Sequence, residues 1–167
     1  DLPKDTSILP DPVFLLTLEQ WRRVATKRKL KKRYVFVYLI QEDVNVLTSA
    51  KKYAKENECD IIINKKSVEF ILNNAPDHFL WWIENAEAVF TNSFHGTAFS
   101  IIFEKLLGAD IILKNGKHNN RIEELLDSGG LKECIISEEN YVPKKANAKK
   151  WLNMQRKKAY EFLKGNI

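Results

Sequence analysis

Short apolar runs alternate along the chain with longer stretches in which apolar residues recur at helical spacing. The short runs are rich in β-branched and aromatic residues, which is typical of strands buried on both faces of a sheet. They predict strands at residues 34–40, 60–64, 87–91, 110–113 and 133–136. The amphipathic stretches predict a helix that starts at a Thr17–Gln20 capping box and helices over 43–58, 76–85, 96–107, 120–128 and 146–164.

Strands that alternate with crossover helices imply a parallel sheet with helices on both faces. We therefore expect the α/β class: a three-layer α/β/α Rossmann-like domain with a mainly parallel sheet. The chain has 167 residues, which suits one domain over residues 1–167. In such sheets ligands bind beyond the carboxyl ends of the strands, where loops lead into helices.

Composition narrows the class of protein. The chain is 44% hydrophobic and 29% charged, which is typical of a globular protein. Cys59 and Cys134 lie far apart without a paired motif, which argues against a disulfide framework or a structural zinc site. No apolar run reaches the length of a transmembrane segment, and the start resembles no signal peptide. The two separate cysteines fit a reducing compartment, so we expect a cytoplasmic protein. The net charge of +5 is compatible with anionic ligands.

Two further features each leave alternatives open. The basic run at residues 27–33 is a solvated loop or a surface that attracts an anionic polymer or a membrane. For Trp81 and Trp82 we expect one core ring and one half-exposed ring, because neighbouring helix residues point about 100° apart. The half-exposed ring could stack on a sugar.

The richest chemistry lies at residues 91–100, between a predicted strand and a predicted helix. The first N–H groups of a helix lack partners and carry the positive end of its dipole. Asn92, Ser93 and Thr97 add short polar groups, Gly96 allows close approach to the backbone, and His95 adds a titratable ring. This combination predicts an anion site. The alternative is that Ser93 only caps the helix and His95 packs with a satisfied hydrogen bond.

Residues 79–103 closely resemble the signature of the polysaccharide pyruvyl transferase family. Residues 11–16 with Trp21, residues 34–38, and residues 120–126 with Gly130 and Leu131 resemble further blocks of that family in the same order. Two positions depart from its pattern. Cys134 stands where an arginine is usual, which removes a basic contact, and Ala159 stands where a serine is usual.

The resemblance implies an enzyme of two domains, similar to the glycosyltransferase-B fold, with its active site between the halves. This chain would be the C-terminal half; an N-terminal domain would be missing, and an isolated half can be inactive. The implied reaction transfers the enolpyruvyl group of phosphoenolpyruvate to a pair of sugar hydroxyls. The product is a pyruvate ketal in cell-surface or exopolysaccharide biosynthesis. The saccharide acceptor can be lipid-linked, which would place the protein peripherally at the inner membrane face.

The resemblance also suggests roles for single residues. His95 is the candidate catalytic acid or a contact to the anionic groups of the donor. Arg121 is the candidate clamp for a carboxylate or phosphate, because its planar fork binds two oxygens at once; the alternative is a surface arginine on a helix. Asn92 and Ser93 would be secondary contacts, and Gly96 and Thr97 complete the predicted binding set. We expect no metal and no cofactor besides phosphoenolpyruvate as donor substrate.

Two other classes of function compete with this one. A glycosyltransferase-like domain would hold a nucleotide sugar at the same helix N-terminus, but the glycine-rich loop and E-x(7)-E pattern that would favour it are missing from the sequence. A non-catalytic basic module would bind nucleic acid. Lysines spread over several segments, without a recognised motif, argue against nucleic acid as a partner.

Overall fold

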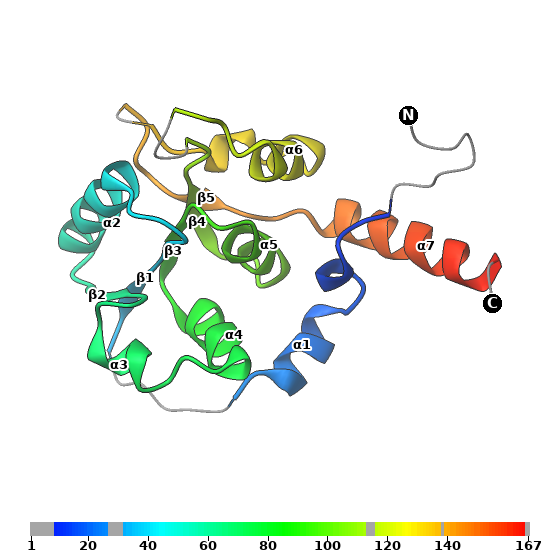
Figure 1. Ribbon diagram of the computed structural model, residues 1–167, viewed down its shortest axis with the longest axis horizontal. Helices are drawn as coiled ribbons and strands as arrows, with labels where there is room; N and C mark the ends of the chain where they lie inside the picture. Colours follow the sequence, from blue (N-terminus) through cyan, green and yellow to red (C-terminus); the bar gives the residue numbers. More distant parts are fainter. Residues whose placement is uncertain (1–8, 27–31, 113–115, 138, 166–167) are drawn as a thin grey trace.

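A five-stranded sheet forms the centre of the protein (Figure 1). The computed structural model describes residues 9–26, 32–112, 116–137 and 139–165. The strand order is β2-β1-β3-β4-β5, and all neighbouring pairs are parallel except β4–β5. The strands are β1 (Tyr34–Tyr38), β2 (Asp60–Ile63), β3 (Ala88–Thr91), β4 (Leu106–Ala109) and the short edge strand β5 (Lys144–Lys145).

Helices cover both faces of this sheet. The helix α2 (Val44–Glu56) packs on one face against β1 and β3, and α4 and α5 cover the other face. The remaining elements and bounds are η1 (Pro12–Phe14), α1 (Leu18–Val24), α3 (Val68–Ile71), α4 (Pro76–Asn85), α5 (Phe94–Ile102), α6 (Asn120–Ser128), η2 (Lys132–Cys134) and α7 (Lys149–Gly165). The predicted three-layer α/β/α Rossmann-like fold is confirmed.

Alternation along β1 divides the core into two clusters. Val35 and Val37 point towards α2, while Tyr34 and Phe36 point towards α4. All four side chains are buried, which is why β1 reads as a continuous apolar run. The Tyr34 hydroxyl donates to the carbonyl of Trp82 at 2.9 Å and so fixes the end of α4 on the sheet.

Both rings of the Trp81–Trp82 pair are buried, with exposures of 4% and 1%. The expected half-exposed ring is therefore wrong. Trp82 packs against Phe36, with ring centroids 6.2 Å apart, and Trp81 packs edge-on against Trp82 at 4.9 Å. Adjacent helix positions can both be buried here because α4 lies between the sheet and neighbouring helices, including α1 and α5.

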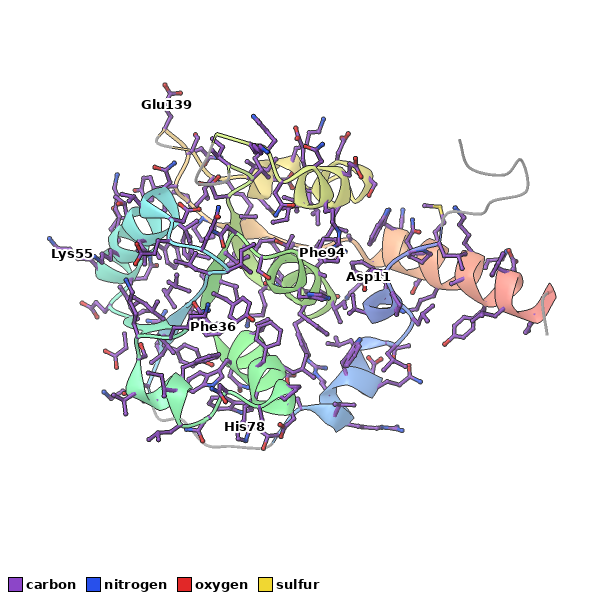
Figure 2. The ribbon with its side chains drawn as sticks, in the orientation of Figure 1. Asp11, Phe36, Lys55, His78, Phe94 and Glu139 are labelled. Atoms are coloured by element: carbon purple, nitrogen blue, oxygen red, sulfur yellow. The ribbon has the colours of Figure 1, made fainter. Side chains whose placement is uncertain are left out.

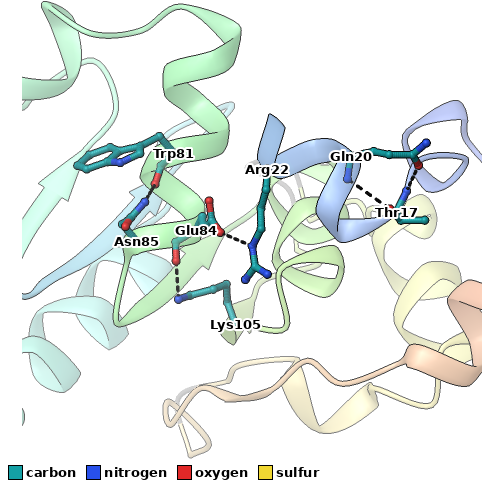
Figure 3. Close-up of polar contacts among 7 residues, drawn as sticks. All are labelled: Thr17, Gln20, Arg22, Trp81, Glu84, Asn85 and Lys105. Atoms are coloured by element: carbon teal, nitrogen blue, oxygen red, sulfur yellow. Dashed lines mark hydrogen bonds and ion pairs between the residues drawn. The ribbon is translucent and has the colours of Figure 1, made fainter. Parts of the chain in front are cut away.

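Polar contacts hold α1 against α4 (Figure 3). Thr17 caps α1 by accepting from the amide of Gln20, whose side chain accepts from the Thr17 amide, so the predicted capping box is confirmed. Arg22 pairs with the Glu84 carboxylate at 2.6 Å. The Lys105 ammonium donates to the Glu84 carbonyl at 2.9 Å, and burial lowers the pKa of that ammonium.

The helix predicted over residues 96–107 and the strand predicted over 110–113 are both displaced. The helix α5 ends at Ile102, and the strand β4 begins at Leu106, inside the predicted helix. The residues on both sides of Glu104 and Lys105 are apolar, and short apolar runs cannot by themselves distinguish a buried helix from a buried strand. The chain turns between them at Glu104, which adopts a positive φ of 53°.

The last predicted strand and the start of the last helix also differ. Residues 133–136 form the end of η2 and a single parallel bridge from Ile135 to Ala109, and the fifth strand is β5 instead. Both residues of β5 are exposed lysines, so no apolar pattern marks this strand. The last helix begins at Lys149 rather than at 146, and the sequence did not predict the short helix α3.

Most of the basic run at 27–33 lies outside the described residues. Its last two members are described, and each is paired: Lys32 with Asp60 at 3.1 Å and Arg33 with Glu87 at 3.2 Å. Over the described ranges, no helix combines the length and apolar character that crossing a bilayer requires.

Candidate active site

The loop between β3 and α5 is held by hydrogen bonds within itself. Thr91 Oγ1 accepts from the amide of Ser93 at 3.0 Å, and Ser93 Oγ caps α5 by accepting from the amide of Gly96 at 3.3 Å. The hydroxyl of Thr97 donates to the Ser93 carbonyl at 3.0 Å. Ser93 and Thr97, two of the predicted ligand-binding residues, are buried, and their side chains hold the shape of the loop. A contact from either of them to a ligand stays a prediction.

Gly96 is required by its neighbour across the loop. A Cβ added at this position would lie 2.5 Å from Thr91 Oγ1 and 3.1 Å from Thr91 Cβ. The predicted access of a ligand to the backbone at Gly96 stays a prediction. In the structure, the close approach of Thr91 is the reason why residue 96 has no room for a side chain.

We predict that Gly96→Ala destabilises the fold by about 1–3 kcal/mol, because the new methyl group overpacks a tight contact. Urea unfolding monitored by tryptophan fluorescence would measure this. Gly165→Ala is the matched control, since no described atom lies within 4 Å of a Cβ there. Equal stabilities for the two variants would contradict the assigned role of Gly96.

Asn92 ties this loop to the loop that follows β1. Its side chain is fully buried, and its Oδ1 accepts from the amide of Ile40 at 3.0 Å. Its Nδ2 donates to the Gln41 carbonyl at 3.2 Å and to Asp43 Oδ2 at 3.1 Å. Both amide hydrogens are therefore engaged by the protein, and a contact from Asn92 to the donor stays a prediction.

His95 is exposed on the first turn of α5. Its ring meets the Phe94 ring edge-on, with centroids 5.5 Å apart. The amides of Phe94 and His95 have no acceptor within the helix, because the first N–H groups of an α-helix have no preceding turn. The structure thus leaves the imidazole open to solvent beside the positive end of a nine-residue helix.

Arg121 comes to the same place from a different part of the chain. It lies in the first turn of α6, and its guanidinium stacks over the Phe94 ring at 4.0 Å from the centroid. One of its nitrogens also pairs with Asp11 Oδ2 at 3.3 Å, and Figure 2 shows Phe94 and Asp11 in this region. Arg121 and His95 thus both contact the ring of Phe94, a residue that the sequence did not indicate as part of the site.

Two carboxylates near this loop were also missed. Asp43 caps α2 and accepts a hydrogen bond from Asn92, and Asp110 directly follows β4 with an exposure of 2%. Burial raises the pKa of the Asp110 carboxyl, and the negative charge of Asp43 raises it further. The sequence did not indicate Asp110 as a site residue because we expected it to start a strand. In the structure it follows strand β4 instead, at the carboxyl edge of the sheet, where ligands bind in folds of this kind.

Asp110→Asn should stabilise the protein near neutral pH. A carboxyl whose pKa is raised on folding favours the folded state below its ordinary pKa, and that advantage is lost as pH rises through the folded value. Each unit of such a shift corresponds to about 1.4 kcal/mol. The amide keeps an acceptor for the Ile112 N–H, which now donates to Asp110 Oδ1 at 2.7 Å.

Urea unfolding from pH 4 to 8 would test this expectation. The variant should lose the part of the pH dependence that arises from this carboxyl. The exposed Asp127→Asn, on α6, is the control. A wild-type profile that Asp110→Asn leaves unchanged would show that the carboxyl is not perturbed.

A hollow of about 280 Å³ with both apolar and polar lining residues opens beyond the carboxyl ends of β1 and β2. Lys65 and Lys66 line it, and Lys66 pairs with Glu42 at 3.8 Å. Gln41 also lines it and carries a side-chain nitrogen that is buried and lacks a partner within the described part of the chain. This hollow touches the β3–α5 loop through the Gln41–Asn92 hydrogen bond.

The two positions that depart from the resemblance lie in the interior. Cys134 is 1% exposed, and burial raises the pKa of its thiol to about 12. Ala159 is 2% exposed within α7. Among the described residues, no group of three or more His, Cys, Asp or Glu side chains could hold a metal ion.

Comparison with known proteins identifies the family. The family model described as polysaccharide pyruvyl transferase matches residues 2–105. The match includes the whole β3–α5 loop with His95 and ends before Arg121. No curated protein and no solved structure matches the chain. Because the family model covers more than half of the 167 residues, the chain belongs to the polysaccharide pyruvyl transferase family.

Proposed function

We propose that this protein transfers the enolpyruvyl group of phosphoenolpyruvate to a pair of hydroxyls on a saccharide, forming a pyruvate ketal and releasing phosphate. The observation that carries the proposal is the position of His95. It lies inside the segment that matches the family, and it is the exposed titratable group on the first turn of α5. An anionic donor suits that place because free amides and the helix dipole favour negative charge there.

The donor would bind through its phosphate and carboxylate. The imidazole of His95 would donate to one of these groups, and a bound dianion favours its protonated form. Arg121 would contribute a two-pronged clamp, since its guanidinium matches the geometry of a carboxylate or phosphate. The donor would then compete with Asp11, which accepts from Arg121 in the structure described.

Transfer requires a proton on the methylene carbon of the donor, and in this proposal His95 would supply it. Protonation makes the neighbouring carbon electrophilic, and the first sugar hydroxyl attacks it and loses its proton. Cleavage of the carbon–oxygen bond then expels phosphate, and the second hydroxyl attacks the same carbon. The diol thus gives up two protons, the new methyl group gains one, and phosphate takes the other. General acid catalysis of this kind contributes about 10²–10⁴-fold.

Further parts of the proposal come from the family resemblance. A second, N-terminal domain would close over the carboxyl edge of the sheet and complete the site, as in glycosyltransferase-B-like enzymes. The product would belong to a cell-surface or exopolysaccharide pathway. The enzyme would then work in the cytoplasm, at the inner membrane face where its acceptor is lipid-linked.

The test is to incubate the full-length protein with phosphoenolpyruvate and saccharides that carry a free diol. Phosphate release would be measured together with mass spectrometry of the saccharide. The proposal predicts phosphate and a saccharide heavier by a ketal-linked pyruvate in equal amounts. Phosphate without the modified saccharide would indicate hydrolysis, and turnover of a nucleotide sugar instead would indicate a glycosyltransferase.

A further inference from the structure

A hollow of about 500 Å³ lies beside the candidate active site. Residues of the N-terminal segment, of the start of α5, of α6 and of α7 line it. Phe94 and Arg121 belong both to this hollow and to the cluster around His95. A molecule bound here would therefore contact Phe94, whose ring also meets the imidazole of His95.

The positive and negative side chains that line the hollow are equal in number. Asp11 and Glu124 supply two carboxylates, and Arg121 and Lys158 supply two cations, so the formal charges of the lining sum to zero. A strongly charged ligand of either sign would meet groups of its own sign. A neutral molecule rich in hydroxyls can instead donate to the carboxylates and accept from the cations.

An aromatic wall accompanies these polar groups. Trp151 lines the hollow and is half-buried, and the Phe14 ring supports its indole edge-on at a centroid distance of 5.2 Å. Gln155, one helical turn further along α7, adds an amide that can both donate and accept. An apolar ring face beside groups that donate and accept is the chemistry that fits a sugar ring.

We infer that this hollow binds the saccharide acceptor, with the sugar between Trp151 and Arg121 and its reacting diol directed towards His95. The inference rests on the proposed function for the identity of the reaction. Binding of a neutral sugar can nevertheless be measured without the donor. Glu124, Trp151 and Gln155 line the hollow and would contact the bound saccharide.

The test measures binding of methyl β-glycosides of galactose, glucose and mannose by saturation-transfer NMR, with no donor present. We expect at least one glycoside to bind the full-length protein. Glu124→Gln and Gln155→Ala should each weaken that binding at least fivefold. Asp127→Asn is the matched control for Glu124→Gln, because it makes the same change at another exposed position of α6 and should leave binding unaltered.

Two results would overturn the inference. One is that none of the glycosides binds. The other is that a glycoside binds with equal affinity to the wild type, Glu124→Gln and Gln155→Ala. Failure of the proposed function has a different signature, since the sugar would then bind as expected while phosphoenolpyruvate is not consumed. Normal pyruvyl transfer with an acceptor KM that both variants leave unchanged would remove the inference and keep the function.

Discussion

His95→Ala is expected to lower the rate of pyruvyl transfer by at least about a hundredfold, which is the smaller end of what a positioned general acid contributes. The imidazole lies at the surface, beside the Phe94 ring, and its removal leaves no cavity in the core. The free energy of unfolding should therefore change by no more than about 0.5 kcal/mol. Steady-state phosphate release and urea unfolding of the full-length protein would measure the two effects.

His118→Ala provides the matched control. This histidine is also exposed and lies close to the start of α6, where it approaches Glu123 at 3.8 Å. It should retain nearly full activity. Near-normal turnover in His95→Ala, or equal losses in both variants, would reject a catalytic role for His95.

Asn92→Asp is expected to destabilise the protein by about 3–5 kcal/mol at pH 7, the cost of leaving a buried charge without its partner. The change replaces a donor by a second carboxylate directly against Asp43, at a position with no exposure to solvent. The hydrogen bond to the Gln41 carbonyl is lost as well. The loop that leads into α5, the helix that carries His95, would then lose its attachment to the loop after β1.

Acid should partly rescue this variant. Burial beside Asp43 would raise the pKa of the new carboxyl on folding, so the penalty is absent below its ordinary pKa and grows as pH rises through the folded value. Asn153→Asp is the control, because Asn153 is exposed on α7 and accepts from Arg156, so a carboxylate is tolerated there. Urea unfolding at pH 4 and 7 would measure both. A destabilisation of Asn92→Asp no larger than that of the control would contradict the structural role of Asn92.

The sequence predicted the sheet where each apolar run is bounded by polar residues. The runs at 34–40, 60–64 and 87–91 meet this condition, and each contains a strand. It failed between residues 96 and 113, a mostly apolar stretch in which only Glu104 and Lys105 separate the end of a helix from a strand. The boundary there depends on the backbone at Glu104, which hydrophobicity does not record. Strand β5 was missed because main-chain pairing with β4, and not burial of side chains, defines it.

The candidate site shows a similar division. The place of His95 at the start of α5 could be predicted, because strand, polar loop and helix follow one another within a few residues. The contacts of Arg121 with Phe94 and Asp11 could not, since they join three segments that only the tertiary fold brings together. Asn92 was predicted as a ligand contact, and only the structure shows that its amide is engaged by the loop after β1.

The central claim is that the exposed imidazole of His95 and the neighbouring helix amides bind the acidic donor. Heteronuclear NMR of the full-length protein during titration with phosphoenolpyruvate tests it most directly. The account predicts saturable shifts of the His95 ring signals and of the Phe94 and His95 amide signals, with the ring shifting towards its protonated form. It would be contradicted if phosphoenolpyruvate did not bind, or if it bound and left these signals unchanged.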